Sequence, residues 1–131
     1  MGKIDLRPKK CNLCGGDVIY TSNKIIYGKE YGNGKIYYCT KCHAFVGTHK
    51  HEPWKAEGIL ANYKMRKLRT ECHKIFDSLW RDTENFRKEH RKKYKWIAEE
   101  MGIPVEECHF GWFDEEELEK ALSILKNYIK E

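Results

Sequence analysis

The sequence lacks any apolar run of signal-peptide length, and no segment approaches the roughly 20 apolar residues that cross a bilayer. We therefore expect a cytoplasmic protein without membrane contact. Internal repeats and low-complexity stretches are also missing. Hydrophobic residues make up 40% of the 131 positions, which is enough apolar surface for a packed core and excludes a disordered chain.

Four of the six cysteines form two C-x-x-C pairs, Cys11 with Cys14 and Cys39 with Cys42. In a reducing cytosol such pairs favour metal ligation over disulfides, and four thiolates suit tetrahedral Zn²⁺ at about 2.3 Å. Gly15 and Gly16 let the first turn close. We predict one structural zinc ion, which has no open coordination position and therefore performs no hydrolysis.

Three alternatives to this zinc site remain open. Paired C-x-x-C turns also make Fe–S₄ sites of the rubredoxin type, so iron is a rival to zinc. Two disulfides or a dithiol redox centre are disfavoured by the expected compartment and by the absence of a βαβ context. A second metal site drawn from His49, His73 and His109 is conceivable, whereas Cys72 and Cys108 fit apolar positions as small hydrophobic residues.

The N-terminal part, residues 1–52, is predicted to be a zinc ribbon of short antiparallel strands. Apolar and β-branched runs at 18–20, 25–27, 36–38 and 45–46 are typical of strands. Asn33-Gly34 favours a tight turn, because both residues tolerate positive φ, and we expect it at the tip of a hairpin leading into the second cysteine pair.

The part from 53 to 131 shows the spacing of about three helices, and we expect it to pack with the ribbon as one compact unit of the α+β class. The first helix is capped by Asn62, the second runs from near Thr83 to Gly102 antiparallel to the first, and the third starts with the capping-box pair Asp114 and Glu117. The predicted buried faces are Met65, Leu68, Cys72, Ile75, Phe76, Leu79 and Trp80; Phe86, His90, Ile97 and Met101; and Leu118, Ala121, Leu122, Leu125 and Ile129.

Charge is unevenly distributed along the chain. Residues 1–63 and 64–95 carry net charges of +5 and +7, whereas residues 96–131 carry −7. This polarity suits a surface that faces nucleic acid and is backed by an acidic helix, and Tyr37 or Tyr38 could stack on bases. The candidate phosphate contacts are Lys9, Lys10, Lys41, Lys50, Lys64, Lys67, Lys74, Arg87, Arg91 and Lys92.

Two other functions compete with nucleic-acid binding. The acidic C-terminal helix could instead offer a surface for a host protein. A metal-dependent nuclease using His73, Asp77 and His109 is the third possibility, but no nucleophile, open metal site or phosphate loop accompanies these residues, so the sequence favours a protein that is not an enzyme. DNA versus RNA and the oligomeric state stay open.

Several separated motifs resemble one family. They are Cys11-x-x-Cys14-Gly15-Gly16, Tyr38-Cys39-x-x-Cys42-x-Ala44-x-Val46-Gly47-x-His49, Leu68-Arg69-x-x-Cys72-His73-x-x-Phe76-Asp77-x-Leu79-Trp80, and Cys108-His109-Phe110-Gly111-x-Phe113. Over roughly residues 11–113 the chain is similar to the zinc-finger-containing domain of unknown function found mainly in bacteriophages and prophages. The resemblance implies a phage or prophage origin and the four zinc ligands, and it leaves the acidic C-terminal helix outside the aligned part.

Overall fold

The computed structural model describes residues 5–130, so residues 1–4 of the predicted ribbon lie outside it. The chain divides into two compact units between Tyr63 and Lys64. The first contains three strands and the four paired cysteines, and the second contains three long helices, which confirms the α+β class. The packing of the two parts into one unit stays a prediction.

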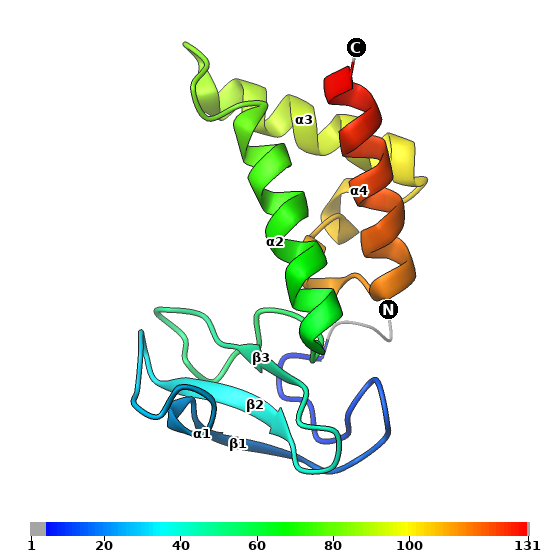
Figure 1. The fold of residues 1–131 in the computed structure, drawn as a ribbon. Helices are drawn as coiled ribbons and strands as arrows, with labels where there is room; N and C mark the ends of the chain where they lie inside the picture. The colour runs from blue at the N-terminus through cyan, green and yellow to red at the C-terminus, as the bar shows by residue number, and fades with distance from the viewer. Residues whose placement is uncertain (1–4, 131) are drawn as a thin grey trace. The chain divides into compact units, whose positions relative to one another are not determined.

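The ribbon unit is built on an antiparallel sheet in the order β1-β2-β3 (Figure 1). Strand β1 (Val18–Ser22) pairs with β2 (Lys35–Cys39), so that Val18 lies opposite Cys39. Strand β2 pairs in turn with β3 (Phe45–Gly47). Because both edges of β2 are paired, the strand that ends in Cys39 is fixed on two sides. The segment after β3 folds back on the sheet, where the Ala61 N–H donates to the Phe45 carbonyl at 2.9 Å.

The segment between β1 and β2 differs from the prediction. Ile25, Ile26 and Tyr27 do not form a strand but belong to a single helical turn, α1 (Lys24–Tyr27). The reason is the buried side chain of Asn23, which donates to the Tyr31 carbonyl at 2.8 Å and accepts from the Tyr31 N–H at 3.1 Å. The Asn23 amide closes the loop around α1. A segment of three residues that pairs with no neighbouring strand is not stable as a strand, so the helical turn forms instead.

Asn33-Gly34 is not a two-residue hairpin turn, because it ends a connection that runs from 23 to 34. Gly34 does adopt a positive φ of 79°. The Asn33 side chain is engaged elsewhere: it donates to Thr48 Oγ1 and to the His49 carbonyl, each at 2.9 Å. Asn33 therefore ties the start of β2 to the segment that follows β3.

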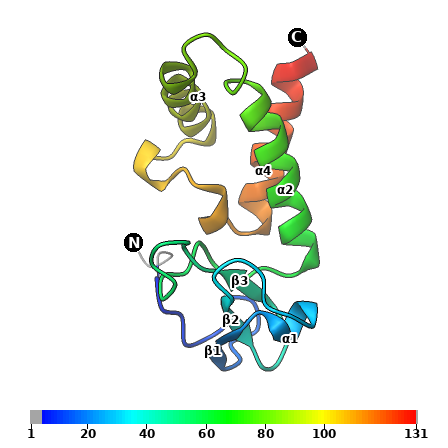
Figure 2. The same cartoon turned by 90° about the vertical axis from the view of Figure 1, so that its left-hand side faces the viewer.

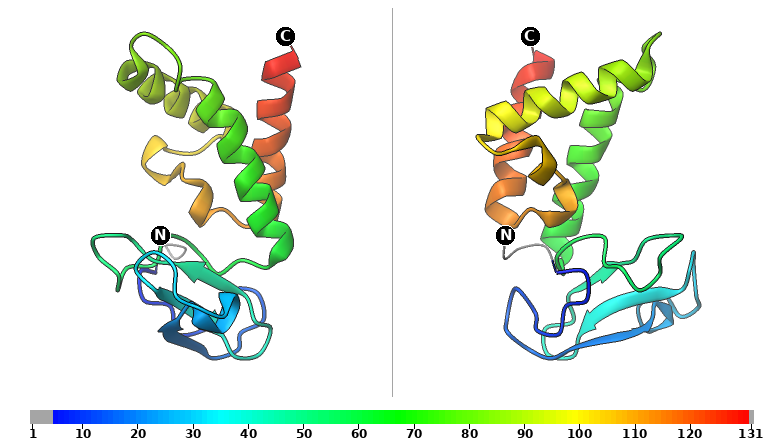
Figure 3. Two further views of the ribbon diagram at one scale, coloured as in Figure 1. Left: turned by 60° about the vertical axis from the view of Figure 1, so that its left-hand side comes forward. Right: turned by 180° about the vertical axis from the view of Figure 1, so that it is seen from behind.

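The helical unit contains α2 (Tyr63–Ser78), α3 (Phe86–Met101) and α4 (Glu115–Lys130), with the short 3₁₀ helices η1 (Val105–Glu107) and η2 (Phe110–Trp112) between α3 and α4. Helices α2 and α4 run side by side in the same direction (Figures 1 and 2). Helix α3 crosses them rather than lying antiparallel along α2, which corrects the expected arrangement (Figure 3). The large side chains of the core with almost no exposed surface are Met65, Phe76, Ile97, Phe110, Phe113, Leu118 and Leu125.

Local signals set the helix ends. Gly102 adopts a left-handed conformation, and its N–H bonds the carbonyls of Ala98 and Glu99, so α3 ends where predicted. The capping box is also confirmed: the Glu117 N–H donates to Asp114 Oδ1 at 2.9 Å, and the Asp114 N–H donates to Glu117 Oε1 at 3.0 Å.

Two of the residues predicted to be buried are exposed. Phe86 has 47% of its surface exposed because α3 begins at this residue, and Ile129 has 54% exposed in the last turn of α4. The first helix ends at Ser78, so Leu79 and Trp80 lie beyond it and are half-buried. Cys72 and Cys108 are fully buried, as expected of small hydrophobic residues. No helix in residues 5–130 has both the length and the apolar character of a membrane span.

Candidate metal centre and basic groove

The two cysteine pairs lie in two turns with the same backbone pattern. In the first turn the Gly15 N–H donates to the Cys11 carbonyl at 2.9 Å, and in the second the His43 N–H donates to the Cys39 carbonyl at 3.1 Å. Gly15 and His43 both have positive φ, 75° and 69°. Glycine adopts this conformation without strain, whereas at His43 the surrounding turn must hold it.

Gly16 is required for the two turns to approach each other. A Cβ atom built on Gly16 would lie 2.7 Å from Lys41 Cβ and 3.1 Å from Cys39 Sγ. Real Cβ atoms do not come so close to another carbon, so any larger residue would push the second turn away. The Cys-Gly-Gly motif therefore provides one glycine for backbone conformation and one for space.

The four sulfur atoms come together as a tetrahedral ion would require. Cys11 Sγ lies 3.7 Å from Cys42 Sγ, and Cys14 Sγ lies 3.5 Å from Cys39 Sγ. All four lie within 4.8 Å of one another. Sulfurs bound at about 2.3 Å to one tetrahedral ion are about 3.8 Å apart, so these spacings fit one four-coordinate metal ion. The cysteines are free of disulfides.

Backbone amides point at the sulfurs and stabilise negative charge on them. The N–H groups of Leu13 and Gly16 lie 3.3 Å from the sulfurs of Cys11 and Cys14. In the second turn the N–H groups of Lys41 and Cys42 each lie 3.4 Å from Cys39 Sγ. Hydrogen bonds to the charged form favour thiolate, which is the form that binds a metal.

Without a cation, the surroundings shift the pKa values of two of these thiols in opposite directions. The backbone N–H of Cys42, helped by that of Lys41, lowers the pKa of Cys39 to about 6. At Cys42 the Ala44 amide also lowers the pKa, but burial and hydrogen bonds with the other three thiols outweigh it and raise the value to about 12. Four adjacent thiolates repel one another, so one divalent cation would allow all four to ionise together.

The ribbon core and the metal centre are continuous. Cys11 and Cys39 are buried in one cluster with Tyr37, Val46 and Leu60. Tyr37 has only 6% of its surface exposed, and its hydroxyl donates to the Trp54 carbonyl at 2.6 Å. The expectation that Tyr37 stacks on bases is therefore wrong, because its ring is part of the core. Tyr38 is half-buried and hydrogen-bonded to the His43 ring.

The residues of the hypothetical nuclease centre do not form a metal cluster. Asp77 accepts from Arg81 Nη2 at 3.0 Å, and the His73 ring packs edge-on against Phe110 with centroids 4.9 Å apart. His109 lies next to the Tyr94 ring instead, at 6.1 Å. Within residues 5–130, three or more potential metal ligands come together only at the four cysteines of the ribbon.

The ten predicted phosphate contacts are all exposed, but their surroundings differ. Lys10 forms an ion pair with Asp17, and Lys64 pairs with Glu115 at 2.9 Å and with Glu119 at 3.6 Å. These two cations are partly neutralised within the molecule, which weakens their attraction for phosphate. The other predicted contacts outside the groove described below are exposed and do not take part in these ion pairs. They are Lys9, Lys41, Lys50, Lys67, Lys74 and Arg87.

Arg91 and Lys92 line a groove of about 750 Å³ between α3 and η1. Lys88 and Lys95, which were not among the predicted contacts, line it as well. The four cations occupy positions i, i+3, i+4 and i+7 of α3 and therefore form one stripe, which we call the basic ridge. That spacing is visible in the sequence, but it becomes significant only once η1 supplies the facing wall. Glu106 is the single carboxylate in the lining.

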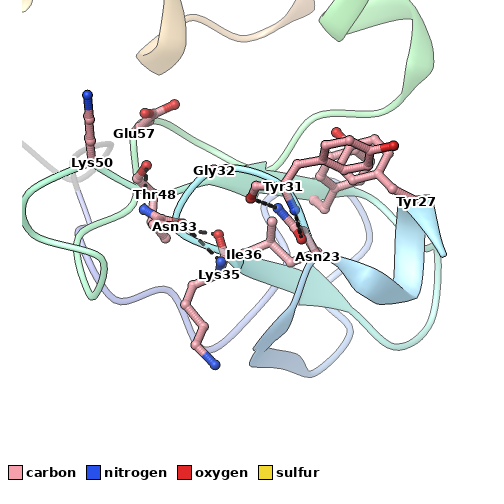
Figure 4. A pocket seen from close by; sticks show the side chains of 12 residues that line it. Asn23, Tyr27, Tyr31, Gly32, Asn33, Lys35, Ile36, Thr48, Lys50 and Glu57 are labelled. Carbon is pink, nitrogen blue, oxygen red and sulfur yellow. Dashed lines mark hydrogen bonds between the residues drawn. The ribbon is translucent and has the colours of Figure 1, made fainter. Parts of the chain in front are cut away.

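A second hollow, of about 1010 Å³, lies on the ribbon unit (Figure 4). Tyr27, Tyr31 and Phe45 form its aromatic end, with Tyr27 edge-on to both other rings. Lys35, Lys50 and Glu57 line the remainder, so this hollow carries charges of both signs. Lys50, a predicted phosphate contact, therefore lies in the same hollow as the Glu57 carboxylate, at the end away from Tyr27 and Tyr31.

Among the comparisons with known proteins, the family model is the one that matches this chain. A search of curated proteins and a search of solved structures each found no match. A family model described as a zinc-finger-containing domain matches residues 7–128. The match extends through most of α4, so the family also covers the acidic C-terminal helix, which lay outside the residues that carried the resemblance. Because the model covers nearly the whole chain, and the four cysteines converge as such a domain requires, this protein belongs to the family of zinc-finger-containing domains.

Proposed function

We propose that this protein is a nucleic-acid-binding accessory or regulatory protein whose ribbon is held together by one structural zinc ion. The observation that carries the nucleic-acid part is the basic ridge, where four exposed cations border one groove with a single carboxylate. A cytosolic location and a phage or prophage origin belong to the same proposal, the latter because the chain resembles the phage-type domains of this family.

Zinc is supported over iron by the family, whose model is described as a zinc-finger-containing domain. Four thiolates occupy all positions of a tetrahedral ion, so the metal holds the two turns together and has no place for a substrate. Because Cys11 and Cys39 belong to the ribbon core, loss of the ion would expose apolar surface as well as thiolates. An iron site of the same geometry would be coloured and redox-active, which a spectrum distinguishes.

The charge of the basic ridge is only partly neutralised by neighbouring carboxylates, which supports binding to phosphate. Glu89 lies 3.8 Å from both Lys92 and Lys93, so it offsets only part of the charge of α3. Exposed ion pairs at such distances contribute little, and the two lysines keep most of their attraction for an external anion. Cations that neutralise phosphates release condensed counterions, which is the main source of affinity in non-specific nucleic-acid binding.

The test is the salt dependence of binding to a mixed-sequence oligonucleotide, measured by fluorescence anisotropy on the zinc-loaded protein. Replacing Arg91, Lys92 and Lys95 together by Gln should flatten the slope of log K against log salt by about 2 to 3. The matched control replaces Lys64, Lys67 and Lys74 by Gln and removes the same formal charge from α2. Because Lys64 is already paired, the control should change the slope less.

The outcomes separate the possible sites. A slope that only the α2 variant flattens would move the phosphate contacts to the face of Lys64, Lys67 and Lys74. No binding at about 50 mM salt, where non-specific electrostatic binding is strong, would reject nucleic acid altogether. Charge reversal at Glu115, Glu116 and Glu119 should leave the affinity unchanged or increase it.

Binding of a host protein is the second candidate, and one observation favours it. The ribbon unit exposes several large apolar side chains, including Ile25, Tyr27 and Tyr31, each of which has more than half of its surface exposed. Two of them line the hollow in Figure 4. A Tyr27→Ser, Tyr31→Ser double variant that loses a copurifying protein while keeping nucleic-acid binding would favour this function for the ribbon.

A further inference from the structure

The groove between α3 and η1 is lined by two chemically different sets of side chains. One set is the basic ridge of Lys88, Arg91, Lys92 and Lys95. The other set consists of rings: His90 and Tyr94 come from α3, and His109 follows η1 near the apolar side chain of Val105. Cations and rings that border one hollow suit a ligand that is both anionic and aromatic.

The rings form a continuous row rather than separate contacts. The His90 ring lies 4.8 Å from Tyr94, and Tyr94 lies 6.1 Å from His109. Trp80 extends the row behind His90 at 4.4 Å. The pairs are edge-on or tilted, so each ring limits the movement of the next.

The core holds this row in place from behind. The Phe76 ring, which is fully buried, packs against Tyr94 with centroids 4.5 Å apart and against His90 at 6.1 Å. Tyr94 and His90 are therefore half-buried, with one side on the core and the other available to the groove. Their orientation is fixed before any ligand arrives, so binding does not have to order them.

The basic ridge has a length that suits a short run of phosphates. Four cations from residue 88 to residue 95 cover about 10 Å of helix at 1.5 Å per residue. Phosphates of one strand are about 3.4 Å apart along a duplex and further apart when the strand is extended, so the ridge spans about two or three. The single negative charge of Glu106 does not balance the four cations, so the lining of the groove keeps a net positive charge.

We propose that this groove binds single-stranded nucleic acid, with phosphates on the basic ridge and unpaired bases stacked on the rings of Tyr94, His90 and His109. The inference rests on the proposed function and narrows it to one class of ligand. In a duplex the faces of the bases are covered by their neighbours, so the rings would find nothing to stack on. Unpaired bases offer a free face of any sequence, and aromatic side chains beside a cationic track are the usual way to bind them.

The experiment compares one fluorescein-labelled strand of about 15 nucleotides, as DNA and as RNA, with the same sequence in a duplex. The zinc-loaded full-length protein should bind the single strands about tenfold or more tightly than the duplex at equal salt. The variant Tyr94→Leu should weaken single-strand binding by about 5- to 100-fold, the range expected from losing one stacked base, without changing the salt slope. Tyr94→Phe should restore it.

Two controls protect against a loss caused by misfolding. His109→Ala changes an exposed ring and should also weaken single-strand binding with the fold intact. Tyr128→Leu removes a partly exposed tyrosine of α4, which packs on Trp96 outside the groove, and should leave binding unchanged. Circular dichroism of each variant confirms that the helices are retained.

Each outcome either supports or overturns the inference. Equal binding of single strand and duplex, or no effect of both Tyr94→Leu and His109→Ala, would overturn the stacking groove and leave phosphate contacts on the basic ridge intact. Binding of neither ligand would overturn the proposed function together with this inference. If DNA and RNA strands bind equally, the groove reads phosphates and base faces alone, and a preference for RNA would indicate an added contact with the 2′-hydroxyl.

Discussion

The six cysteines should fall into two chemical classes, which a count of reactive thiols can separate. Four belong to the metal centre, and the other two, Cys72 and Cys108, are fully buried in the helical unit. Burial raises the pKa of Cys72 to about 12 and that of Cys108 to about 11. Only the thiolate reacts with disulfide or alkylating reagents, so these pKa values predict a rate.

The size of the effect follows from the thiolate fraction. At pH 8 an ordinary thiol with a pKa of about 8.5 is about one quarter ionised. A pKa of about 12 leaves roughly one thiolate in 10⁴, and a pKa of about 11 leaves roughly one in 10³. A thiolate of higher pKa is also more nucleophilic, which offsets part of this loss, so Cys72 should react roughly 50-fold, and Cys108 roughly 20-fold, more slowly than a free cysteine, before steric exclusion adds to the delay.

The assay is a titration with a chromogenic disulfide reagent at pH 8, followed by mass mapping of the modified peptides. Zinc-loaded protein should show no fast thiol, a chelator should release the four ribbon thiols, and denaturant should expose all six. The variant Cys72→Ala should still release four. If Cys72 or Cys108 reacts as fast in the folded protein as in the denatured chain, the assigned packing of the helical unit is refuted. A chelator that releases a number other than four would refute the membership of the metal centre.

Further predictions concern the helical unit. Asp114→Ala should lower the free energy of unfolding by about 1 kcal/mol, or the melting temperature by about 4 to 8 °C, because the Glu117 N–H loses its hydrogen-bond acceptor. Asp114→Asn should keep most of that stability. An unchanged melting curve for Asp114→Ala would contradict the capping box. Phe76→Ala should lower the free energy of unfolding, measured with denaturant, by about 3 to 5 kcal/mol, whereas Phe86→Ala at an exposed position should lower it by less than about 0.5 kcal/mol. Similar losses for both variants would mean that the core is assigned to the wrong residues. Burial lowers the pKa of His73 from 6.5, although Asp77 opposes it, so the unfolded chain binds the proton more readily and stability should fall as the pH decreases through about 6.5. His73→Gln should flatten that decline in unfolding measured from pH 7.5 to 5.5, and an equally steep decline in the variant would exclude His73 as its source.

Features that depend on a few neighbouring residues could be predicted from the sequence. The two C-x-x-C turns, the Asp114 and Glu117 capping box and the Gly102 helix end each specify their own backbone geometry within about one turn of chain. The convergence of the two cysteine pairs followed because β1 and β2 are joined antiparallel, with Val18 opposite Cys39. These are the parts of the structure in which local preference and tertiary contacts agree.

Features that depend on a partner elsewhere in the chain could not be predicted. Ile25, Ile26 and Tyr27 have the composition of a strand, but the contacts of Asn23 with Tyr31 impose a helical turn. Strand preference mainly reflects packing against neighbouring strands, and here there is none. Phe86 satisfied a helical period but lies at the helix start, where no neighbouring element covers it.

The groove shows the same limit at the level of function. Charge composition identified Arg91 and Lys92, but Tyr94 was not among the predicted site residues, and His109 was considered only for a second metal site or a nuclease centre. Their common position in the groove depends on η1, which follows the end of α3 and returns beside it. Periodicity within one helix cannot indicate which of its faces a later segment will approach.

The central claim is that the four ribbon cysteines hold one zinc ion, and native mass spectrometry with elemental analysis tests it most directly. Protein purified without added metal should carry one zinc per chain, be colourless and keep its cysteines reduced. Cys39→Ser should lose the ion, whereas Cys72→Ser should retain it. Iron in the site, a folded ribbon without any metal, or full zinc content in Cys39→Ser would contradict the claim.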